Sequence, residues 1–378
     1  MFLFTVIAIW TVAHAYVVWR LWSVPVLAAP VGRRLLLSVM ALAWIAYPLA
    51  RILHWRHAHT AGTLLEFPAA AWLGVLFLLF AALLVSDVLT AGGLLLGRHA
   101  PAARGWVAAV ALALSAFGLA QGLRDPVVRD YEVRLAGLPP GRDGLVLVEV
   151  SDMHLGTLIG GRWMRRQVAR VDALKPDLVV VDGDLVDGNI HEVEPLLPIL
   201  RQLRAPLGVW AVTGNHEFYA GVDRCVRLFE DAGYTVLRDR WMQAAPGLIL
   251  AGVDDLTGRR QFGLSDHPVE RALADRPPGA TILFSHTPWQ ADVAAAAGAG
   301  LMLCGHTHDG QIWPFGYLVR LVYPLLSGRY QVSGLPVLVC RGTGTWGPRM
   351  RLWRPSEILR VTLRAGGPAA APPPTLPL

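Results

Sequence analysis

Four apolar stretches in the first third of the chain constrain its fold more than any other feature. They lie near Phe2–Trp19, Leu35–Ile52, Ala69–Leu95 and Trp106–Leu123. A helix needs about 20 apolar residues to cross a bilayer, and only helices and closed barrels satisfy every backbone hydrogen bond in lipid. The first stretch contains an Ala-His-Ala site resembling a signal-peptide cleavage site, but it lacks a basic leading region and runs on past that site. The sequence therefore predicts a multi-pass protein of the cell membrane, with about four transmembrane helices over residues 1–123.

The arginines between these stretches predict the orientation of the helices. Residues 1–123 hold seven arginines, no lysine and two acids, which is +5 of the net charge of +6. Five of the arginines fall in the first and third loops, and Arg51 and Arg56 fall in the second. Because basic loops stay in the cytoplasm, the termini and the large remaining domain are predicted to be extracytoplasmic.

Charge also bears on the expected partners. Without those seven arginines and two acids, the remainder of the chain has 27 basic and 26 acidic residues. A nearly neutral domain gives no reason to expect a nucleic acid as partner. The expected partners are the lipid bilayer and a phosphorylated small-molecule or lipid substrate, and the sequence makes no prediction of oligomeric state.

Beyond Leu123 the sequence changes to the pattern of an α/β domain. Residues 124–144 are polar and marked by Pro and Gly, which is typical of a linker. From residue 145 to 364, short apolar runs alternate with amphipathic stretches such as 164–174 and 222–232. Strands are predicted near residues 145–150, 177–181, 207–213, 248–253, 281–285, 301–304, 335–340 and 357–363. The Pro-rich residues 365–378 are expected to be a disordered tail.

Five of these apolar runs are followed directly by side chains that can bind metal ions. In chain order the side chains are Asp152 and His154, Asp184, Asn215 and His216, His286, and His306 and His308. Open α/β sheets build their sites beyond the carboxyl ends of strands, so these residues are expected to converge. A single Asp-x-His or Gly-Asp after a strand is usually structural. Their joint occurrence, each at a strand end, predicts a metal site.

The ordered motifs SDMHLG, PDLVVVDGDLVDG, GNHEFYAG, SHTP and GHTHDGQ resemble those of the calcineurin-like metallophosphoesterase superfamily. More narrowly, they resemble its membrane-anchored bacterial branch, and the later GTGTWGPRMRL is similar to the end of that branch's domain. The resemblance covers about residues 145–364. It implies a four-layer α/β/β/α sandwich of two mixed sheets, with two metal ions at the strand ends.

The resemblance also implies a role for each residue. Asp152, His154 and His308 would hold the first ion, Asn215, His286 and His306 the second, and Asp184 would bridge both. His216 would face the substrate and protonate the leaving group, or alternatively would only orient a ligand. At Asp309, many relatives have glycine. This extra carboxylate would influence the metal or the substrate charge, or would sit in a solvent-facing turn, which we expect.

Imidazole, carboxylate and carboxamide ligands suit Mn, Fe or Zn better than Ca or Mg. Two such divalent ions can share a bridging hydroxide and clamp an in-line displacement at phosphorus. The sequence thus predicts a membrane-anchored binuclear metal-dependent phosphohydrolase that cleaves phosphodiester or pyrophosphate bonds of lipid-linked or nucleotide substrates. The alternative is a catalytically silent membrane receptor or accessory module that binds a phosphorylated ligand. The natural substrate and the choice among the three metals stay open.

Overall fold

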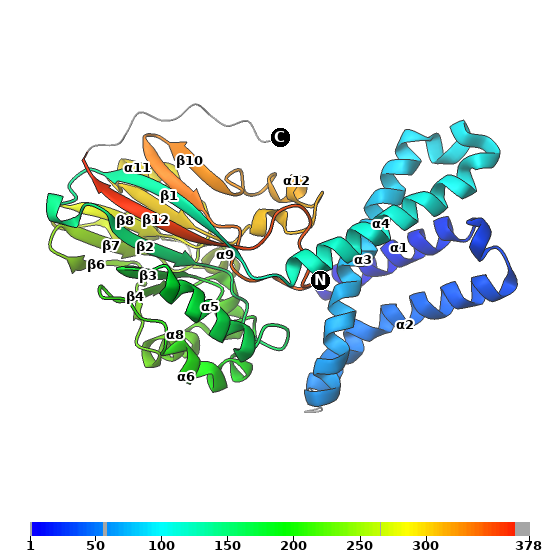
Figure 1. Ribbon diagram of the computed structural model, residues 1–378, viewed down its shortest axis with the longest axis horizontal. Coiled ribbons are helices and arrows are strands. Elements are labelled where there is room, and N and C mark those ends of the chain that lie inside the picture. Colours follow the sequence, from blue (N-terminus) through cyan, green and yellow to red (C-terminus); the bar gives the residue numbers. More distant parts are fainter. Residues whose placement is uncertain (1, 56–58, 265, 367–378) are drawn as a thin grey trace. The chain divides into compact units, whose positions relative to one another are not determined.

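A computed structural model describes residues 2–55, 59–264 and 266–366 of the chain (Figure 1). The chain forms two compact units. The first, which we call the helical unit, consists of residues 1–124 with two short later segments, Ile312–Pro314 and Gly347–Arg354. The second, the sandwich unit, consists of residues 125–311, 315–346 and 355–378. From residue 367 on, the predicted tail lies outside the described residues.

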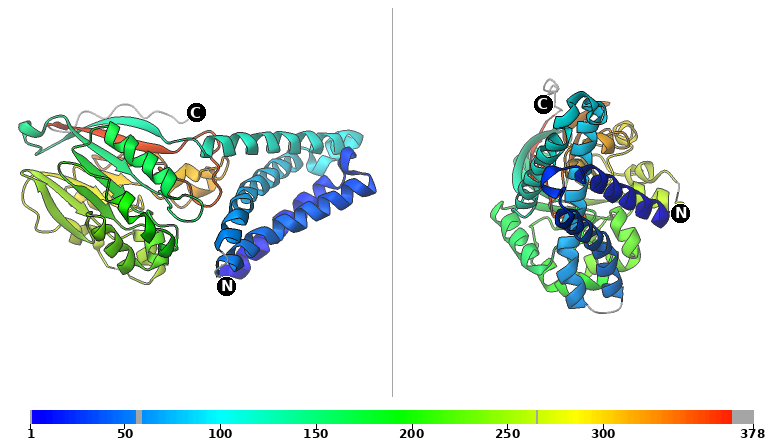
Figure 2. Two further views of the ribbon diagram at one scale, coloured as in Figure 1. Left: turned by 60° about the horizontal axis from the view of Figure 1, so that its bottom comes forward. Right: turned by 90° about the vertical axis from the view of Figure 1, so that its right-hand side faces the viewer.

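The helical unit contains four helices that are long and apolar enough to cross a membrane. They are α1 (Phe2–Leu21), α2 (Pro30–Trp55), α3 (His59–Leu89) and α4 (Ala100–Gly122), with short 3-10 segments at Pro25–Leu27 and Ala91–His99 (Figures 1 and 2). Helix α3 begins ten residues before the apolar stretch that predicted it. Its polar start is accommodated because Glu66 pairs with Nε2 of His54 at 2.8 Å and with Arg51 at 3.4 Å. The other acid of these helices, Asp87, pairs with Arg20 and accepts a hydrogen bond from Tyr16.

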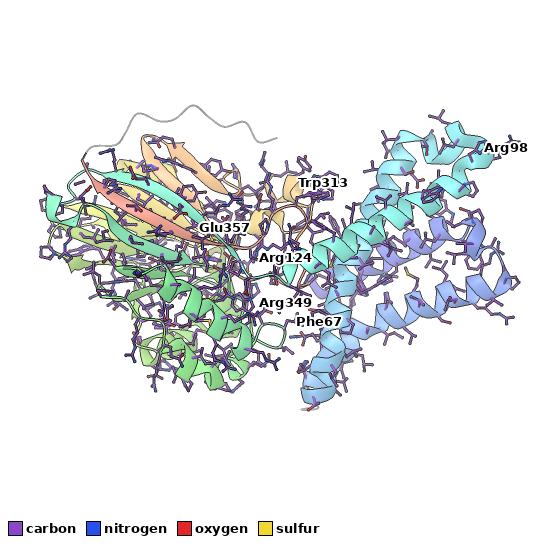
Figure 3. The ribbon with its side chains drawn as sticks, viewed as in Figure 1. Phe67, Arg98, Arg124, Trp313, Arg349 and Glu357 are labelled. Atoms are coloured by element: carbon purple, nitrogen blue, oxygen red, sulfur yellow. The ribbon has the colours of Figure 1, made fainter. Side chains whose placement is uncertain are left out.

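Helix α4 is lined along one side by small residues. Its buried positions include Ala108, Ala111, Ser115, Gly118 and Gly122, spaced by three and four residues. This spacing lets another backbone approach the helix closely. The N–H of Arg351 donates to the carbonyl of Gly118 at 2.8 Å, and Figure 3 shows Arg349 near Arg124 at one end of α4, with Arg98 at the other. The segment Gly347–Arg354 is therefore packed on the carboxyl end of α4.

The sandwich unit contains two six-stranded mixed sheets. The first has the order β1-β12-β2-β3-β4-β5 and the second the order β10-β11-β9-β8-β7-β6. In the first sheet, β2, β3, β4 and β5 run parallel, and in the second, β7, β8, β9 and β11 do. The strands are β1 (Val127–Leu135), β2 (Leu145–Val150), β3 (Leu178–Asp182), β4 (Val209–Val212), β5 (Thr235–Val236), β6 (Arg240–Ala245), β7 (Leu248–Gly252), β8 (Ala280–Phe284), β9 (Leu301–Cys304), β10 (Gly328–Val332), β11 (Leu335–Val339) and β12 (Glu357–Ala365).

Three buried cores separate four layers. Along β3, Leu178 and Val180 point into the core between the two sheets, whereas Val179 and Val181 point into the outer core. Helices α5 (Gly161–Ala173), α6 (Leu197–Leu200) and α8 (Val222–Asp231) cover that outer face of the first sheet. Helices α10 (Pro268–Leu273) and α11 (Ala291–Ala296) cover the outer face of the second sheet. Strands buried on both faces read as continuous apolar runs, and the resulting α/β/β/α sandwich confirms the predicted fold class.

All eight predicted strands are present, but the prediction of a linker over residues 124–144 is wrong for residues 127–135. Residues 127–135 form β1, which pairs in parallel with β12 from Val127 opposite Glu357 to Leu135 opposite Ala365. An edge strand keeps one side in solvent, so its sequence carries charged residues and reads as polar. Only Val133 and Leu135 of this strand are buried.

Candidate metal centre

The polar residues identified in the sequence all lie just beyond the carboxyl ends of parallel strands. Asp152 and His154 follow β2, Asp184 follows β3, and Asn215 and His216 open helix α7 (Asn215–Ala220) after β4. From the second sheet, His286 follows β8, and His306 and His308 follow β9. Because β2, β3 and β4 are neighbours, and β8 and β9 are neighbours, each sheet presents its residues at one edge.

Five of these residues have backbone conformations that no pattern in the sequence predicts. Asp152, His154, Asp184, His306 and His308 all have positive φ angles, between 47° and 72°. Such left-handed conformations cost non-glycine residues about 1–3 kcal/mol each and persist where the surrounding fold enforces them. Sharp turns of this kind aim consecutive loops at one point.

Two glycines allow the loops to approach closely. A Cβ atom on Gly214 would lie 2.1 Å from Oδ1 of Asp184, and one on Gly305 would lie 1.9 Å from Oγ of Ser151. No side chain fits in either place. The glycines that precede Asn215 and His306 are therefore a condition for bringing the ligand loops together.

Asp152, His154 and His308 form the first cluster, with one possible ligand atom from each lying within 4.8 Å of the others. Nε2 of His308 lies 3.2 Å from Oδ1 of Asp152 and 3.0 Å from Nε2 of His154. All three side chains are buried. A carboxylate and two imidazole nitrogens directed at one point form a typical donor set for a divalent transition metal.

The second cluster consists of Asp184, His286 and His306, again with one possible ligand atom from each lying within 4.8 Å of the others. Nε2 of His286 lies 3.1 Å from Oδ2 of Asp184. The same carboxylate oxygen is 3.8 Å from Nε2 of His154, which belongs to the first cluster. Asp184 therefore lies between the two clusters, where it can contact an ion in each.

Unsatisfied buried atoms test whether this site fits a cation. Among the described residues, Oδ1 of Asn215 and Nδ1 of His306 are buried and have no hydrogen-bond partner. A buried polar atom without a partner costs about 1–3 kcal/mol, so most such atoms in folded proteins are paired. An amide oxygen and an imidazole nitrogen both bind transition metals. Both atoms therefore fit a bound cation, and His306 belongs to the second cluster.

Burial and neighbouring charged groups together set the pKa values of the residues in the site. Burial would raise the pKa of Asp152 and Asp184, but the neighbouring histidines hold both below their usual range. Burial and the nearby His286 lower the pKa of His306 to about 3. A neutral imidazole at this position has a free electron pair, as a metal ligand requires.

His216 forms a third group with His154 and Asp184, in which one possible ligand atom from each lies within 4.8 Å of the others. Its Nδ1 lies 3.3 Å from Oδ1 of Asp187, and the same oxygen lies 3.2 Å from Nδ1 of His154. The His216 side chain is 12% exposed, whereas that of His154 is 1% exposed. Burial lowers the pKa of His216, but Asp184 and Asp187 outweigh this effect and raise it to about 9. His216 therefore lies at the edge of the site, in contact with two carboxylates that favour its protonated form.

No role for Glu217 is visible in the sequence, and the structure shows what this residue contacts. Its carboxylate accepts hydrogen bonds from the backbone N–H groups of Asp184, Val186 and Gly214, at 2.7 to 2.9 Å. It therefore fastens the loop after β3 to the loop after β4. The only sequence signal was its position next to His216.

The expectation that Asp309 lies in a solvent-facing turn is wrong. The residue is 8% exposed and adopts a φ of 55° inside the 3-10 turn His308–Gly310. The N–H of Asp309 lies 3.3 Å from Oγ1 of Thr307, which caps the turn. Glycines at 310 and 316 bring the turn against the following segment, which covers it.

Comparison with known proteins defines the sandwich unit as a metallophosphoesterase domain, in the class of phosphoester hydrolases. The calcineurin-like phosphoesterase model matches residues 145–310. An uncharacterized metallophosphoesterase of Aquifex aeolicus is 33% identical over 243 residues, which cover 64% of this chain and 92% of that one. The chain belongs to the calcineurin-like phosphoesterase family.

The name of a second relative includes the word transmembrane. The "Transmembrane protein with metallophosphoesterase domain" of Danio rerio is 35% identical over 263 residues. The match covers 66% of this chain but 60% of the relative, so it spans less than two thirds of that protein. Among solved structures, a dimetal phosphatase from Danio rerio matches 53% of this chain and 88% of its own, with 14% identity and a TM-score of 0.35.

Proposed function

We propose that this protein is a membrane-anchored phosphohydrolase with a binuclear metal centre, which cleaves phosphodiester or pyrophosphate bonds. The observation that supports this most directly is the pair of Asp/His clusters that meet at Asp184. When bound, two divalent ions would polarise a water molecule and neutralise the charge that develops on the phosphoryl group. The donor set favours Mn, Fe or Zn.

Each residue has a separate part in this proposal. Asp152, His154 and His308 would hold one ion, Asn215, His286 and His306 would hold the other, and Asp184 would contribute to both sites. His216 donates its proton to the departing oxygen of the substrate, and Asp187 holds the His216 ring in place from a distance of 3.3 Å. Glu217 keeps the backbone of Asp184 in register with Gly214.

The alternative is a membrane receptor or accessory module that binds a phosphorylated ligand without turning it over. A silent module has no need to retain a proton donor beside an intact ligand set. The chain has His216, with a raised pKa, beside His154 and Asp184, and the groups that could hold a metal ion contain Asp152, His154, Asp184, His286, His306 and His308. These observations favour catalysis over simple binding.

The test uses the full chain in detergent, loaded separately with Mn²⁺, Zn²⁺ or Fe²⁺, and a chromogenic phosphodiester. We expect turnover together with two bound ions per chain by elemental analysis. His308→Ala should lose an ion and the activity. The control variant is His267→Ala, since the side chain of His267 is 88% exposed, and it should keep both ions and the activity. Two bound ions without turnover on phosphodiester or pyrophosphate reporters would favour the receptor instead.

We also propose that the helices anchor the protein in the cell membrane, with the sandwich unit on the extracytoplasmic side. Support comes from the four apolar helices and from the arginines of the first and third loops. Arg56, counted for the second loop, lies outside the described residues. Reporter fusions after Leu123 and within the loop near residue 28 should report opposite sides. An inactive periplasmic-type reporter after Leu123 would reverse the orientation.

A further inference from the structure

An exposed apolar segment projects from the sandwich unit directly after the last metal-ligand turn. The large apolar residues that are exposed in the described part of this unit number ten, and five of them lie between residues 315 and 322. They are Phe315, Tyr317, Leu318, Leu321 and Val322. The most exposed is Leu321, at 81%. Apolar side chains gathered in this way mark an interaction surface, whereas scattered ones do not.

The local backbone gathers four of these side chains on one side. Helix α12 (Gly316–Val319) continues into further helical turns, since the N–H of Arg320 donates to Gly316 and that of Tyr323 to Val319. Tyr317 with Leu321, and Leu318 with Val322, are then spaced by four residues. Such pairs share a face of a helical segment. We call residues 315–322 the apolar segment.

The apolar segment is held against the metal centre at both of its ends. At its start, a Cβ atom on Gly310 would lie 2.3 Å from the backbone of Gly316, so the ligand turn and α12 are in direct contact. At its end, the Tyr323 ring packs edge-on against His306 with centroids 4.7 Å apart, and stacks on Trp289 at 5.2 Å. Whatever binds the apolar segment is thereby placed beside the metal ligands.

A further apolar side chain lies at the edge of the site. Trp346 is 53% exposed, and its ring centroid is 6.1 Å from that of His216. Two hydrogen bonds of 2.9 Å, exchanged between its backbone and the side chain of Gln311, fix its position. Tryptophan and tyrosine are the residues that favour the boundary between water and lipid.

The position of the apolar segment in the chain indicates which partner binds it. Residues Ile312–Pro314, which immediately precede the apolar segment, pack within the helical unit, where Ile312 shares a core with Leu78 of α3. Phe315 is bonded to Pro314, so the apolar segment begins one residue from a part of the chain that lies among the membrane-type helices. A lipid surface is the apolar partner expected for a segment joined to helices that are long and apolar enough to cross a membrane.

We propose that the apolar segment inserts into the headgroup region of the bilayer that anchors the chain, and so presents the metal centre to phosphoesters carried by membrane lipids. This inference rests on the proposed phosphohydrolase function and names its substrate class. Segments with this composition enter a bilayer to a depth of about 5–10 Å.

The first test measures insertion directly, with the full chain in phosphatidylcholine/phosphatidylglycerol nanodiscs that hold one copy each. The three cysteines at 225, 304 and 340 are free and buried, so a fluorophore can be attached selectively to Leu321→Cys. We expect doxyl-labelled lipids to quench this fluorophore. The same fluorophore on Met242→Cys, a half-exposed residue of β6, should not be quenched. Equal, weak quenching at both positions would overturn the proposal.

The second test compares two reporters with the same reacting group. Hexadecyl p-nitrophenyl phosphate resides in the nanodisc, and bis-p-nitrophenyl phosphate resides in water. We expect Leu321→Glu to lower kcat/KM on the lipid reporter by at least about tenfold, since it removes one apolar side chain and adds a charge. Its activity on the water-soluble reporter should stay unchanged, and the matched Met242→Glu should alter neither.

The outcomes separate this inference from the proposed function. Absence of turnover on both reporters by the wild-type chain would overturn the phosphohydrolase itself. Turnover of the soluble reporter with no loss on the lipid reporter in Leu321→Glu would overturn only the lipid surface. A third outcome would assign the apolar segment to a second copy instead: no quenching in single-copy nanodiscs, together with a disulfide that links two Leu321→Cys chains in nanodiscs that hold two copies.

Discussion

His216 is the residue whose chemistry depends most on its neighbours. Protonated by virtue of Asp184 and Asp187, which raise its pKa to about 9, it can donate a proton to a leaving oxygen. General acid catalysis of this kind contributes about 10²–10⁴-fold. We therefore expect His216→Asn to bind two metal ions, as measured by elemental analysis, and to lose about that factor in kcat.

The assignment of His216 as proton donor predicts the direction in which activity changes with pH. Activity that requires a protonated His216 falls as pH rises through its pKa, and the two cations oppose the raising effect of Asp184. We therefore expect an alkaline limb in kcat/KM at or below about pH 9. Asp187→Asn removes one carboxylate and should move the limb to lower pH. If the alkaline limb lies at the same pH in wild type, His216→Asn and Asp187→Asn, His216 has a positioning role only.

Glu149 is a second residue with an unusual pKa, located in β2 three residues before Asp152. Burial, followed by repulsion from Asp182, raises the pKa of Glu149 well above its ordinary value of 4.5. The folded chain then retains a proton that the unfolded chain releases, so this residue lowers stability as pH rises above about 5. We expect Glu149→Gln to raise the Tm relative to wild type more at pH 8 than at pH 5. Thermal unfolding of the full chain in detergent measures both, and an equal difference at the two pH values would refute it.

At the scale of single elements, helix α4 shows why its small residues matter. A Cβ on Gly122 would lie 2.5 Å from the carbonyl oxygen of Arg349, and one on Gly118 would lie 3.5 Å from that of Arg351. A larger side chain at 122 must therefore displace the segment Gly347–Arg354. We expect Gly122→Leu to destabilise the protein by about 1–3 kcal/mol, seen as a lower Tm in detergent. Ala120→Leu, on the more exposed side of the same helix, should leave Tm within experimental error.

The elements also show which parts of the fold the sequence could predict. Strands such as β3 and β9 are buried on both faces, so their apolar runs were visible, and the candidate metal ligands followed because each stood at the end of such a run. Strand β1 was missed because it is an edge strand with exposed Arg129 and Asp130. The segment Gly347–Arg354 was assigned to the α/β domain, because no local pattern indicates that it packs on α4. Packing between distant residues decides such cases.

The burial of Asp309 has the same origin. An acid that follows a histidine in a Gly-rich turn is usually exposed, and the sequence offers nothing to the contrary. The structure covers it because Gly310 and Gly316 allow the next segment to pack on the turn. The role of Glu217 is not visible in the sequence either, since its three backbone partners lie on two separate loops. Side chains whose partners are distant in sequence are the ones that sequence patterns leave undecided.

At the scale of the whole molecule, the candidate metal centre lies where loops from the two sheets of the sandwich meet. Asp152, His154, Asp184 and Asn215 come from strands of the first sheet, and His286, His306 and His308 from strands of the second. An ion held by ligands from both sheets binds the folded state and has no comparable site in the unfolded chain. Metal binding must therefore stabilise the sandwich as a unit.

This linkage sets an expected size. Free metal at about 1,000 times its dissociation constant adds about 4 kcal/mol to the free energy of unfolding, which for a domain of this length is about 10 °C in Tm. We expect Mn²⁺ or Zn²⁺ to raise the Tm of the full chain by this order and chelation to reverse it. His308→Ala and His286→Ala should each lose part of the increase, and His267→Ala should retain it. A Tm that is the same with metal and with chelator would mean that the seven side chains do not bind ions together, since an ion held by both sheets cannot leave without cost.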